Sequence, residues 1–117
     1  MSNEIKKVSK IIDKLVTYFL HNGAKNIAFN LTESIERYEL KFVIEDFPEF
    51  AKDLEEFESK ISARKQPELE NYYWQLAGEI ENSNELNIVA MMCDDISFSY
   101  ENSKLELSLK RLIKPLK

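Results

Sequence analysis

Hydrophobic residues recur at every third or fourth position over the first twenty residues of the chain. The recurring positions are Ile5, Val8, Ile12, Leu15, Val16 and Phe19, with lysines and acids between them. Such spacing forms one apolar stripe along a helix, so a helix is predicted from about Asn3 to His21. Ser2 or Asn3 can cap its start, and Asn22-Gly23 supplies the left-handed residue that ends it.

The pattern then changes to strict alternation. Hydrophobic side chains occupy every second position, at Ile27, Phe29 and Leu31 and again at Tyr38, Leu40, Phe42 and Ile44. A period of two is typical of strands that pack one face on the core and turn the other to water. Two antiparallel strands are therefore predicted, joined by the polar turn Glu33–Glu36. This turn contains no glycine, so the sequence leaves the register of the hairpin open.

A second hairpin is predicted near the end of the chain. Its hydrophobic positions are Ile96, Phe98 and Tyr100, followed by Leu105, Leu107 and Leu109. The polar pair Asn102-Ser103 lies between the two runs and is typical of a tight turn.

The stretch between the hairpins carries helical signals. Pro48 suits the first turn of a helix. The apolar stripe of this second helix is Phe47, Phe50, Leu54, Phe57 and Ile61. A third helix is predicted to run from Pro67 to Gly78. The period of Glu85–Cys93 fits both a strand and a helix, and a strand there would add a central member to the sheet.

Together these elements predict one domain over residues 1–117, of the α+β class. Three to four helices are expected to pack on one face of a mainly antiparallel sheet made of the two β-hairpins, in a two-layer arrangement.

Composition and charge narrow the function classes. The chain is 44% hydrophobic and 32% charged with a net charge of −5, which is typical of a folded protein that binds neither nucleic acid nor anionic lipid. The local basic set Lys110, Arg111, Lys114 and Lys117 is interpreted as a solvated tail. The start of the chain lacks the apolar core of a signal peptide, and no apolar run approaches the ~20 residues that span a bilayer. A cytoplasmic protein without membrane contact is expected.

Single copies of the reactive residues exclude several kinds of site. Cys93 and His21 are the only cysteine and the only histidine, so neither a disulfide nor a cysteine or histidine metal cluster can form within the chain. Cys93 is interpreted as a buried hydrophobe, and His21 as a side chain that serves the end of the first helix. Asp94-Asp95 could bind a divalent cation, but a helix-to-strand junction is favoured, and no metal site is predicted.

Two stretches resemble the ATP-binding domain of histidine kinases and anti-sigma-factor kinases, which has the Bergerat fold. "LVTYFLHNGAKNIAFNL…LKFVIED" is similar to the family's asparagine-box helix, followed by a hairpin and an adenine-contacting aspartate. "LNIVAMMCDDISFSYENSKLELSLKRL" is similar to the family's last helix and closing hairpin. The resemblance implies a helix over Glu85–Cys93 and an adenine-nucleotide pocket lined by Tyr18, Asn22 and Asp46.

The phosphate-binding glycines of that family have no counterpart in this chain. Asp46 is followed by the glycine-free run Phe47–Phe50, Gly78 is the only glycine near the expected second glycine box, and Tyr18 replaces the magnesium-binding asparagine. Side chains in such loops block the approach of backbone N–H groups to an anion. ATPase or kinase activity is therefore not expected, no cofactor is predicted, and the site is interpreted as degenerate.

Asp46 has two interpretations. In a nucleotide pocket its carboxylate would be buried and would face the ligand. In the structural interpretation it caps the helix that begins near Pro48 by accepting a backbone N–H of the first turn. The cap is the favoured prediction.

The aromatic run Tyr72-Tyr73-Trp74 suggests a partner-binding site. Consecutive residues lie about 100° apart around a helix, so these three side chains occupy more than one face. At least one of them is therefore expected to lie outside the core, unless the helix is buried on two sides. Exposed tyrosine and tryptophan are typical anchors of protein interfaces. The predicted function is a non-catalytic regulatory or adaptor domain that binds another protein, a second copy of the chain being one such partner. The alternative is a small-molecule module that binds an adenine nucleotide in a reduced pocket.

Overall fold

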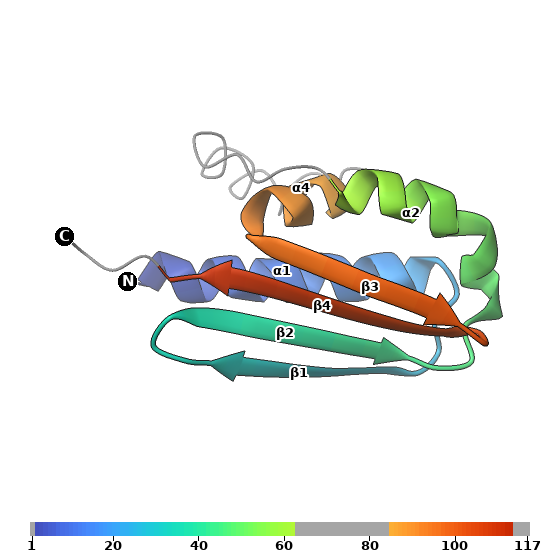
Figure 1. Ribbon diagram of the computed structural model, residues 1–117, viewed down its shortest axis with the longest axis horizontal. Coiled ribbons are helices and arrows are strands. Elements are labelled where there is room, and N and C mark those ends of the chain that lie inside the picture. The colour runs from blue at the N-terminus through green and yellow to red at the C-terminus, as the bar shows by residue number, and fades with distance from the viewer. Residues whose placement is uncertain (1, 63–84, 114–117) are drawn as a thin grey trace.

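The computed structural model describes residues 2–62 and 85–113, which form one open antiparallel sheet with helices on one face (Figure 1). The elements in chain order are α1 (Ser2–His21), β1 (Ile27–Glu33), β2 (Arg37–Ile44), the 3₁₀ helix η1 (Pro48–Asp53), α2 (Leu54–Ile61), α4 (Glu85–Met92), β3 (Asp95–Glu101) and β4 (Lys104–Leu112). The strand order is β1-β2-β4-β3. This arrangement confirms the predicted two-layer α+β class. None of the described helices combines the length and the apolar character needed to cross a membrane.

The end of α1 is set by glycine, as the sequence predicts. Gly23 has a φ of 103°, a conformation that favours glycine. Its N–H donates to the Leu20 carbonyl at 3.2 Å, and the N–H of Ala24 donates to the Phe19 carbonyl at 3.0 Å. These are the two bonds of a Schellman motif. A Cβ on Gly23 would lie 3.3 Å from the side chain of Glu49, so the same residue allows η1 to pack against the helix end.

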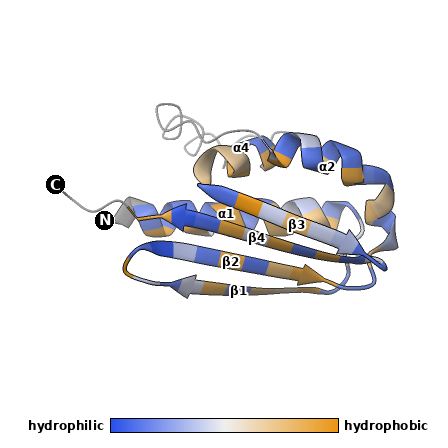
Figure 2. Cartoon of the chain, in the orientation of Figure 1, coloured by the Kyte–Doolittle hydropathy of each residue, from blue (hydrophilic) through white to orange (hydrophobic). Residues whose placement is uncertain are grey.

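The two central strands supply the sheet's part of the core. Their buried inward side chains are Tyr38, Leu40, Phe42 and Ile44 on β2 and Leu105, Leu107 and Leu109 on β4. Cross-strand pairing joins them into rows, and one row runs through Phe29, Phe42, Leu107 and Phe98. Figure 2 shows the resulting alternation of hydrophobic and hydrophilic positions along the strands.

Phenylalanine rings fill the space between the helices and the sheet near the end of α1. The ring of Phe19 lies 6.0–6.5 Å, centroid to centroid, from four other phenylalanine rings. All five rings are fully buried: Phe19, Phe42, Phe47, Phe50 and Phe57. Aromatic pairs at such distances add to the stabilisation that burial alone provides.

Both hairpin turns are specified by short polar residues. Asn102 and Ser103 have φ values of 52° and 62°, the signature of a type I′ turn. In the first hairpin, the Ser34 hydroxyl oxygen accepts the N–H groups of Glu36 and Arg37, each at 3.2 Å. A serine side chain thereby stabilises a turn that has no glycine.

Arg111 connects three elements from inside the structure. Its guanidinium donates to the Glu4 carboxylate at 3.0 and 2.9 Å and to the Met92 carbonyl at 2.6 Å. The side chain is only 5% exposed. The interpretation of Arg111 as part of a solvated basic tail is therefore wrong: it ties β4 to the first turn of α1 and to the end of α4.

The ambiguous segment Glu85–Cys93 is helical up to Met92, as the family resemblance implies. Its buried side chains lie on several sides of the helix: Leu86, Ile88, Val89, Ala90 and Met92. A helix buried on several sides has no clear polar face, which explains why its period was uninformative.

The predicted cap at Asp46 is wrong. The chain continues past β2 into η1, whose N-cap residue is Phe47, and no side-chain cap bond forms there. Asp46 itself is exposed and has a φ of 53°, a left-handed conformation that aspartate tolerates better than most residues. Its role is to turn the chain so that Phe47 enters the core.

Candidate functional site

Tyr18 and Asn22 lie at the end of α1, and Asp46 lies in the connection between β2 and η1. The ring of Tyr18 packs 5.4 Å from Phe19 and 5.9 Å from Phe57. The amide of Asn22 donates to the Tyr18 carbonyl at 2.8 Å and so satisfies an acceptor in the last turn of α1. Asp46 faces solvent. Each of the three residues thus has a role in the local fold.

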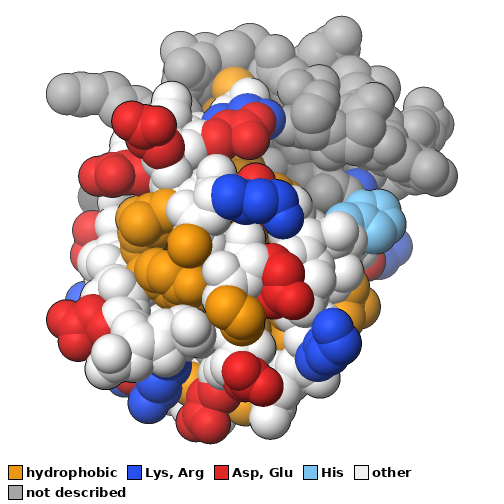
Figure 3. Space-filling model, turned by 90° about the vertical axis from the view of Figure 1, so that its right-hand side faces the viewer, with side chains coloured by type: hydrophobic (Ala, Val, Ile, Leu, Met, Phe, Trp, Pro, Cys, Tyr) orange, Lys and Arg blue, Asp and Glu red, His pale blue; other side chains and the backbone are white. Residues whose placement is uncertain are grey.

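The interior beside these residues is occupied by side chains. Phe47 and Phe50, the two aromatic residues of the glycine-free run after Asp46, are fully buried and stack 5.2 Å apart. Figure 3 shows the surface at this end of the molecule, with His21 in pale blue and side chains of both charge signs interspersed.

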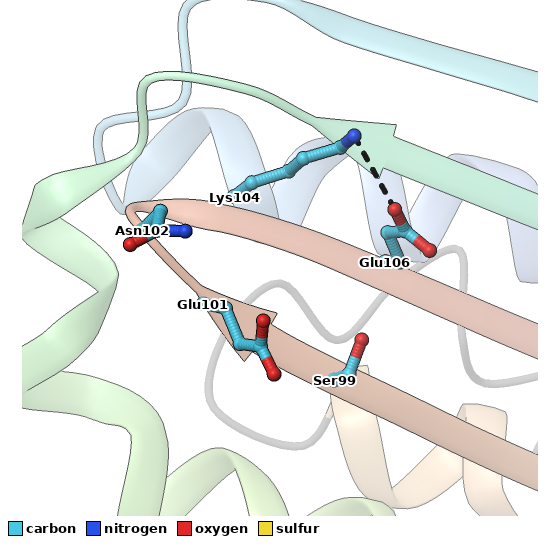
Figure 4. Close-up of a pocket in the computed structure, with 5 residues that line it drawn as sticks. All are labelled: Ser99, Glu101, Asn102, Lys104 and Glu106. Carbon is cyan, nitrogen blue, oxygen red and sulfur yellow. Dashed lines mark ion pairs between the residues drawn. The ribbon is translucent and has the colours of Figure 1, made fainter.

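A hollow of about 430 Å³ lies on the open face of the sheet at the β3–β4 turn (Figure 4). Its lining residues are Ser99, Glu101, Asn102, Lys104 and Glu106. The Lys104 ammonium and the Glu106 carboxylate form an ion pair at 3.4 Å, and both side chains are exposed by more than 40%. An exposed pair of this kind contributes little binding energy.

Two further depressions are lined by surface polar groups. One, of about 210 Å³, crosses the open face of β1, β2 and β4 and includes Asn30, Lys41 and Lys110. The other, of about 280 Å³, lies along α1 beside Lys6 and Asp13. Within residues 2–62 and 85–113, no group of three or more histidine, cysteine, aspartate or glutamate side chains could hold a metal ion.

The acidic pair Asp94-Asp95 lies at the junction between α4 and β3, as predicted. The Asp94 carboxylate accepts the backbone N–H of Leu112 at 2.7 Å. The backbone N–H of Asp94 donates to the Lys110 carbonyl at 2.8 Å. Asp95 pairs with Lys110 across the strands. Asp94 thus extends the pairing with β4 by one residue before the start of β3.

The resolved changes in pKa concern three neighbours on β2. A hydrogen bond from Arg37 at 2.6 Å lowers the pKa of the Glu39 carboxyl, and the same bond raises the pKa of Arg37. Burial raises the pKa of Tyr38, with the charges of Glu33 and Glu4 adding to the effect and Arg111 opposing it. Of these three groups, Glu39 lines the depression of about 210 Å³ on the open face of the sheet.

In the part of the chain that the structure describes, β1 is a terminal strand of the sheet, and one side of its backbone has no neighbouring strand. Ser34 N–H donates to the Arg37 carbonyl at 2.9 Å, which makes these two a hydrogen-bonded pair. Such pairs alternate along an antiparallel ladder, so in the observed register the even-numbered residues of β1 bond to β2. The residues whose N–H and C=O groups point to the free edge are Ile27, Phe29, Leu31 and Glu33.

The inner face of β1 is only partly covered. Phe29 and Leu31 point to the helix side of the sheet but remain 47% and 42% exposed. Figure 1 shows why: α1 runs behind β3 and β4, and β1 extends beyond the described helices. We call the free backbone groups of β1 together with Phe29 and Leu31 the β1 edge. It combines hydrogen-bonding backbone with exposed apolar area, which is the chemistry of strand addition.

Sequence reasoning placed Phe29 and Leu31 in the core and did not identify the β1 edge. The alternation indicates which face a residue occupies but not whether its strand is central or terminal in the sheet. One signal was present: β1 is rich in strand-forming residues, and Glu33 at its end is its only charge, whereas protected edge strands carry charges.

The proposed partner site Tyr72-Tyr73-Trp74 lies outside the described residues. No protein-family model, curated protein or solved structure matches the chain.

Proposed function

We propose that the chain is a non-catalytic regulatory or adaptor domain that acts by protein–protein interaction, and that its contact surface is the β1 edge. The observation that carries this proposal is the exposure of Phe29 and Leu31 on a strand whose outer side has no neighbour among residues 2–62 and 85–113. An extended partner segment would add a strand next to β1, with main-chain hydrogen bonds for affinity and side-chain contacts for specificity.

The composition of the chain limits the catalytic schemes that it could use. The whole sequence has one histidine and one cysteine, so a cysteine–histidine pair could be formed only by Cys93 with His21. His21 is exposed at the end of α1 and Cys93 is buried after α4. The order of helix, hairpin, helix and hairpin agrees with a Bergerat-like framework in degenerate form, which remains part of the proposal.

Site-specific photo-crosslinking tests the contact surface. A photoreactive phenylalanine analogue replaces Phe29 on β1 or, as a control, the exposed Ser97 on the other edge strand. Adducts with a partner protein are expected at position 29 and not at position 97. Equal yields at both positions, or none at position 29, would contradict the proposal.

A backbone variant makes this test specific for strand addition. Leu31→Pro removes an N–H that points to the free edge, so the ladder with β2 keeps its bonds. Leu31→Ala is the matched control, because it shortens the side chain and keeps the N–H. The adduct at position 29 should disappear in Leu31→Pro and persist at reduced yield in Leu31→Ala.

A thermal-shift assay with adenine nucleotides, with and without Mg²⁺, tests the alternative function. A ligand at 100 times its dissociation constant stabilises a protein by ~2.7 kcal/mol, which is a readily measured shift. The protein-binding proposal expects no shift. A saturable shift that Asp46→Ala abolishes would favour the nucleotide-binding module instead.

A further inference from the structure

We infer that the occupant of the β1 edge is the β1 strand of a second copy of this chain, paired antiparallel about a two-fold axis at Asn30. The two four-stranded sheets would then form one continuous eight-stranded sheet, with both helix layers on the same face. This inference rests on the proposed function, because it names the partner of the same surface.

The backbone geometry selects this register. The residues with outward N–H and C=O groups are Ile27, Phe29, Leu31 and Glu33, as derived from the pairing of β1 with β2. Pairing β1 with itself about Asn30 joins Ile27 to Glu33 and Phe29 to Leu31 of the other copy, so all four outward residues bond. Asn30 then faces its own counterpart as a pair without mutual hydrogen bonds.

The side chains are complementary in the same register. Phe29 of each copy lies beside Leu31 of the other, on the inner face where both are now about half exposed. Each of these side chains gains an apolar neighbour on its open side. Cross-strand pairs of aromatic and aliphatic residues are a main source of stability between strands.

The charges at the two ends of β1 also favour antiparallel self-pairing. Lys25 precedes the strand, and Glu33 and Glu36 lie at its other end, all exposed. Antiparallel pairing places the lysine of one copy diagonally beside Glu33 of the other, within reach of long side chains. Parallel pairing would place like charges together at both ends.

The other edge strand is a poor partner for β1. β3 has acids at both ends, Asp95 and Glu101. Pairing β1 of one copy with β3 of the next would be a heterologous contact, which continues from copy to copy without closing. Pairing β1 with β1 uses the same surface twice and closes as a dimer.

The mass of the purified protein in solution is the first test. Light scattering or sedimentation over a concentration series is expected to give twice the 13.8 kDa of one chain. Leu31→Lys puts a charge into the apolar pair on each side of the axis and should raise the dissociation constant of the dimer about tenfold or more. Thr32→Lys, the matched control, adds the same charge to the open face of the same strand and should leave the mass unchanged. Circular dichroism verifies that both variants are folded.

Disulfide formation tests the register. In the inferred pairing the two Asn30 Cα atoms lie about 4.5 Å apart, within the range of a disulfide. Asn30→Cys should therefore give a covalent dimer under mild oxidation. Ala28→Cys is the control: its counterpart is displaced by four residues, roughly 13 Å along the strand, so it should not cross-link. The native Cys93 is buried and is the same in both variants.

The outcomes separate this inference from the proposed function. A wild-type chain that stays monomeric at all concentrations overturns self-pairing, while crosslinking of another protein at position 29 would still support the β1 edge as a contact surface. A dimer that Leu31→Lys does not weaken, or that cross-links equally through positions 28 and 30, overturns the register and places the dimer contact elsewhere.

Discussion

The two edge strands of the sheet differ in how they are protected. On β3, Phe98 packs 5.1 Å from Phe57 and Tyr100 packs 5.2 Å from Phe50, ring to ring, and the ends are acidic. On β1, Phe29 and Leu31 point the same way but remain 47% and 42% exposed, and none of the described helices covers them. Equal alternation of hydrophobic residues thus yields one edge strand whose inner face is covered by described helices, the closed edge, and one whose inner face is partly uncovered, the open edge. The position of the helices therefore decides which edge strand keeps exposed apolar side chains, and the charges of each strand add to the difference.

The largest expected effect comes from opening the closed edge. Phe57→Ala removes the fully buried ring that covers Phe98 and should lower the free energy of unfolding by about 3–5 kcal/mol. Chemical denaturation measures this loss. Phe29→Ala is the matched change on the open edge. Because the ring of Phe29 is half exposed, its removal should lower the free energy of unfolding clearly less. Equal losses for the two variants would contradict the difference between the edges.

The second prediction concerns the side chain that holds α1 over β4. Arg111→Met keeps most of the buried volume but removes the bonds to Glu4 and the Met92 carbonyl. Because Glu4 is partly exposed and can be solvated again, we expect a loss of about 2 kcal/mol in unfolding free energy. Faster hydrogen exchange in the first turns of α1 should accompany it. Unchanged exchange there would show that Arg111 does not position the helix.

The third prediction tests the loop that supports the end of β3. Phe47 donates its N–H to the Ser103 carbonyl at 2.7 Å and accepts the Tyr100 hydroxyl at 2.8 Å, so the turn at Asp46 helps to close this edge. Asp46→Val should cost about 1–2 kcal/mol, since a β-branched residue tolerates the left-handed conformation poorly. Asp46→Gly should be neutral or stabilising in the same denaturation assay. The opposite order would restore a capping or ligand-binding role for the carboxylate.

The smallest effect is a pH dependence near the open edge. The hydrogen bond from Arg37 lowers the pKa of Glu39 below its ordinary 4.5, so the folded state favours the charged carboxylate. The stability that this hydrogen bond contributes is fully present above the pKa that Glu39 has in the unfolded chain. It is lost as the pH falls through the lower pKa that Glu39 has in the folded protein. Glu39→Gln should flatten the acid side of the stability profile slightly, as measured by denaturation at neutral and acidic pH. An unchanged profile would show that the pair contributes nothing measurable.

Local features of this fold could be predicted from the sequence, and features that depend on distant residues could not. The helix α1, the glycine that ends it, and both hairpins follow from spacing and turn chemistry. The predicted stripe of α1 is correct at Val8, Leu15 and Phe19 but wrong at Ile5, which is 64% exposed, and it omits the buried Ile11. The exposure of Phe29 depends on which strand lies at the edge, and that order is set by contacts far apart in the chain. The proline two residues after Asp46 favours a helix cap at Asp46. The residue between them, Phe47, is buried, however, and the chain turns at Asp46 to bring Phe47 into the core.

Arg111 illustrates a signal that was present and misread. It continues the inward positions Leu105, Leu107 and Leu109 with the same period of two, so its side chain faces the helix layer. A charge at such a position calls for a buried partner. That partner, Glu4, lies 107 residues earlier in the chain, beyond the reach of a local pattern.

The placement of β4 between β2 and β3 has a consequence for the order of events during synthesis. The strand that is translated last among the four is one of the two that complete the middle of the sheet. Until Lys104–Leu112 has left the ribosome, β2 has one unpaired side and β3 has no neighbour in the sheet. The nascent chain must therefore carry α1, the first hairpin and the phenylalanine-rich segment without a closed core, and the domain folds in one late step. Ribosome-bound chains that stop before this strand should be sensitive to proteases and should recruit chaperones along most of their length.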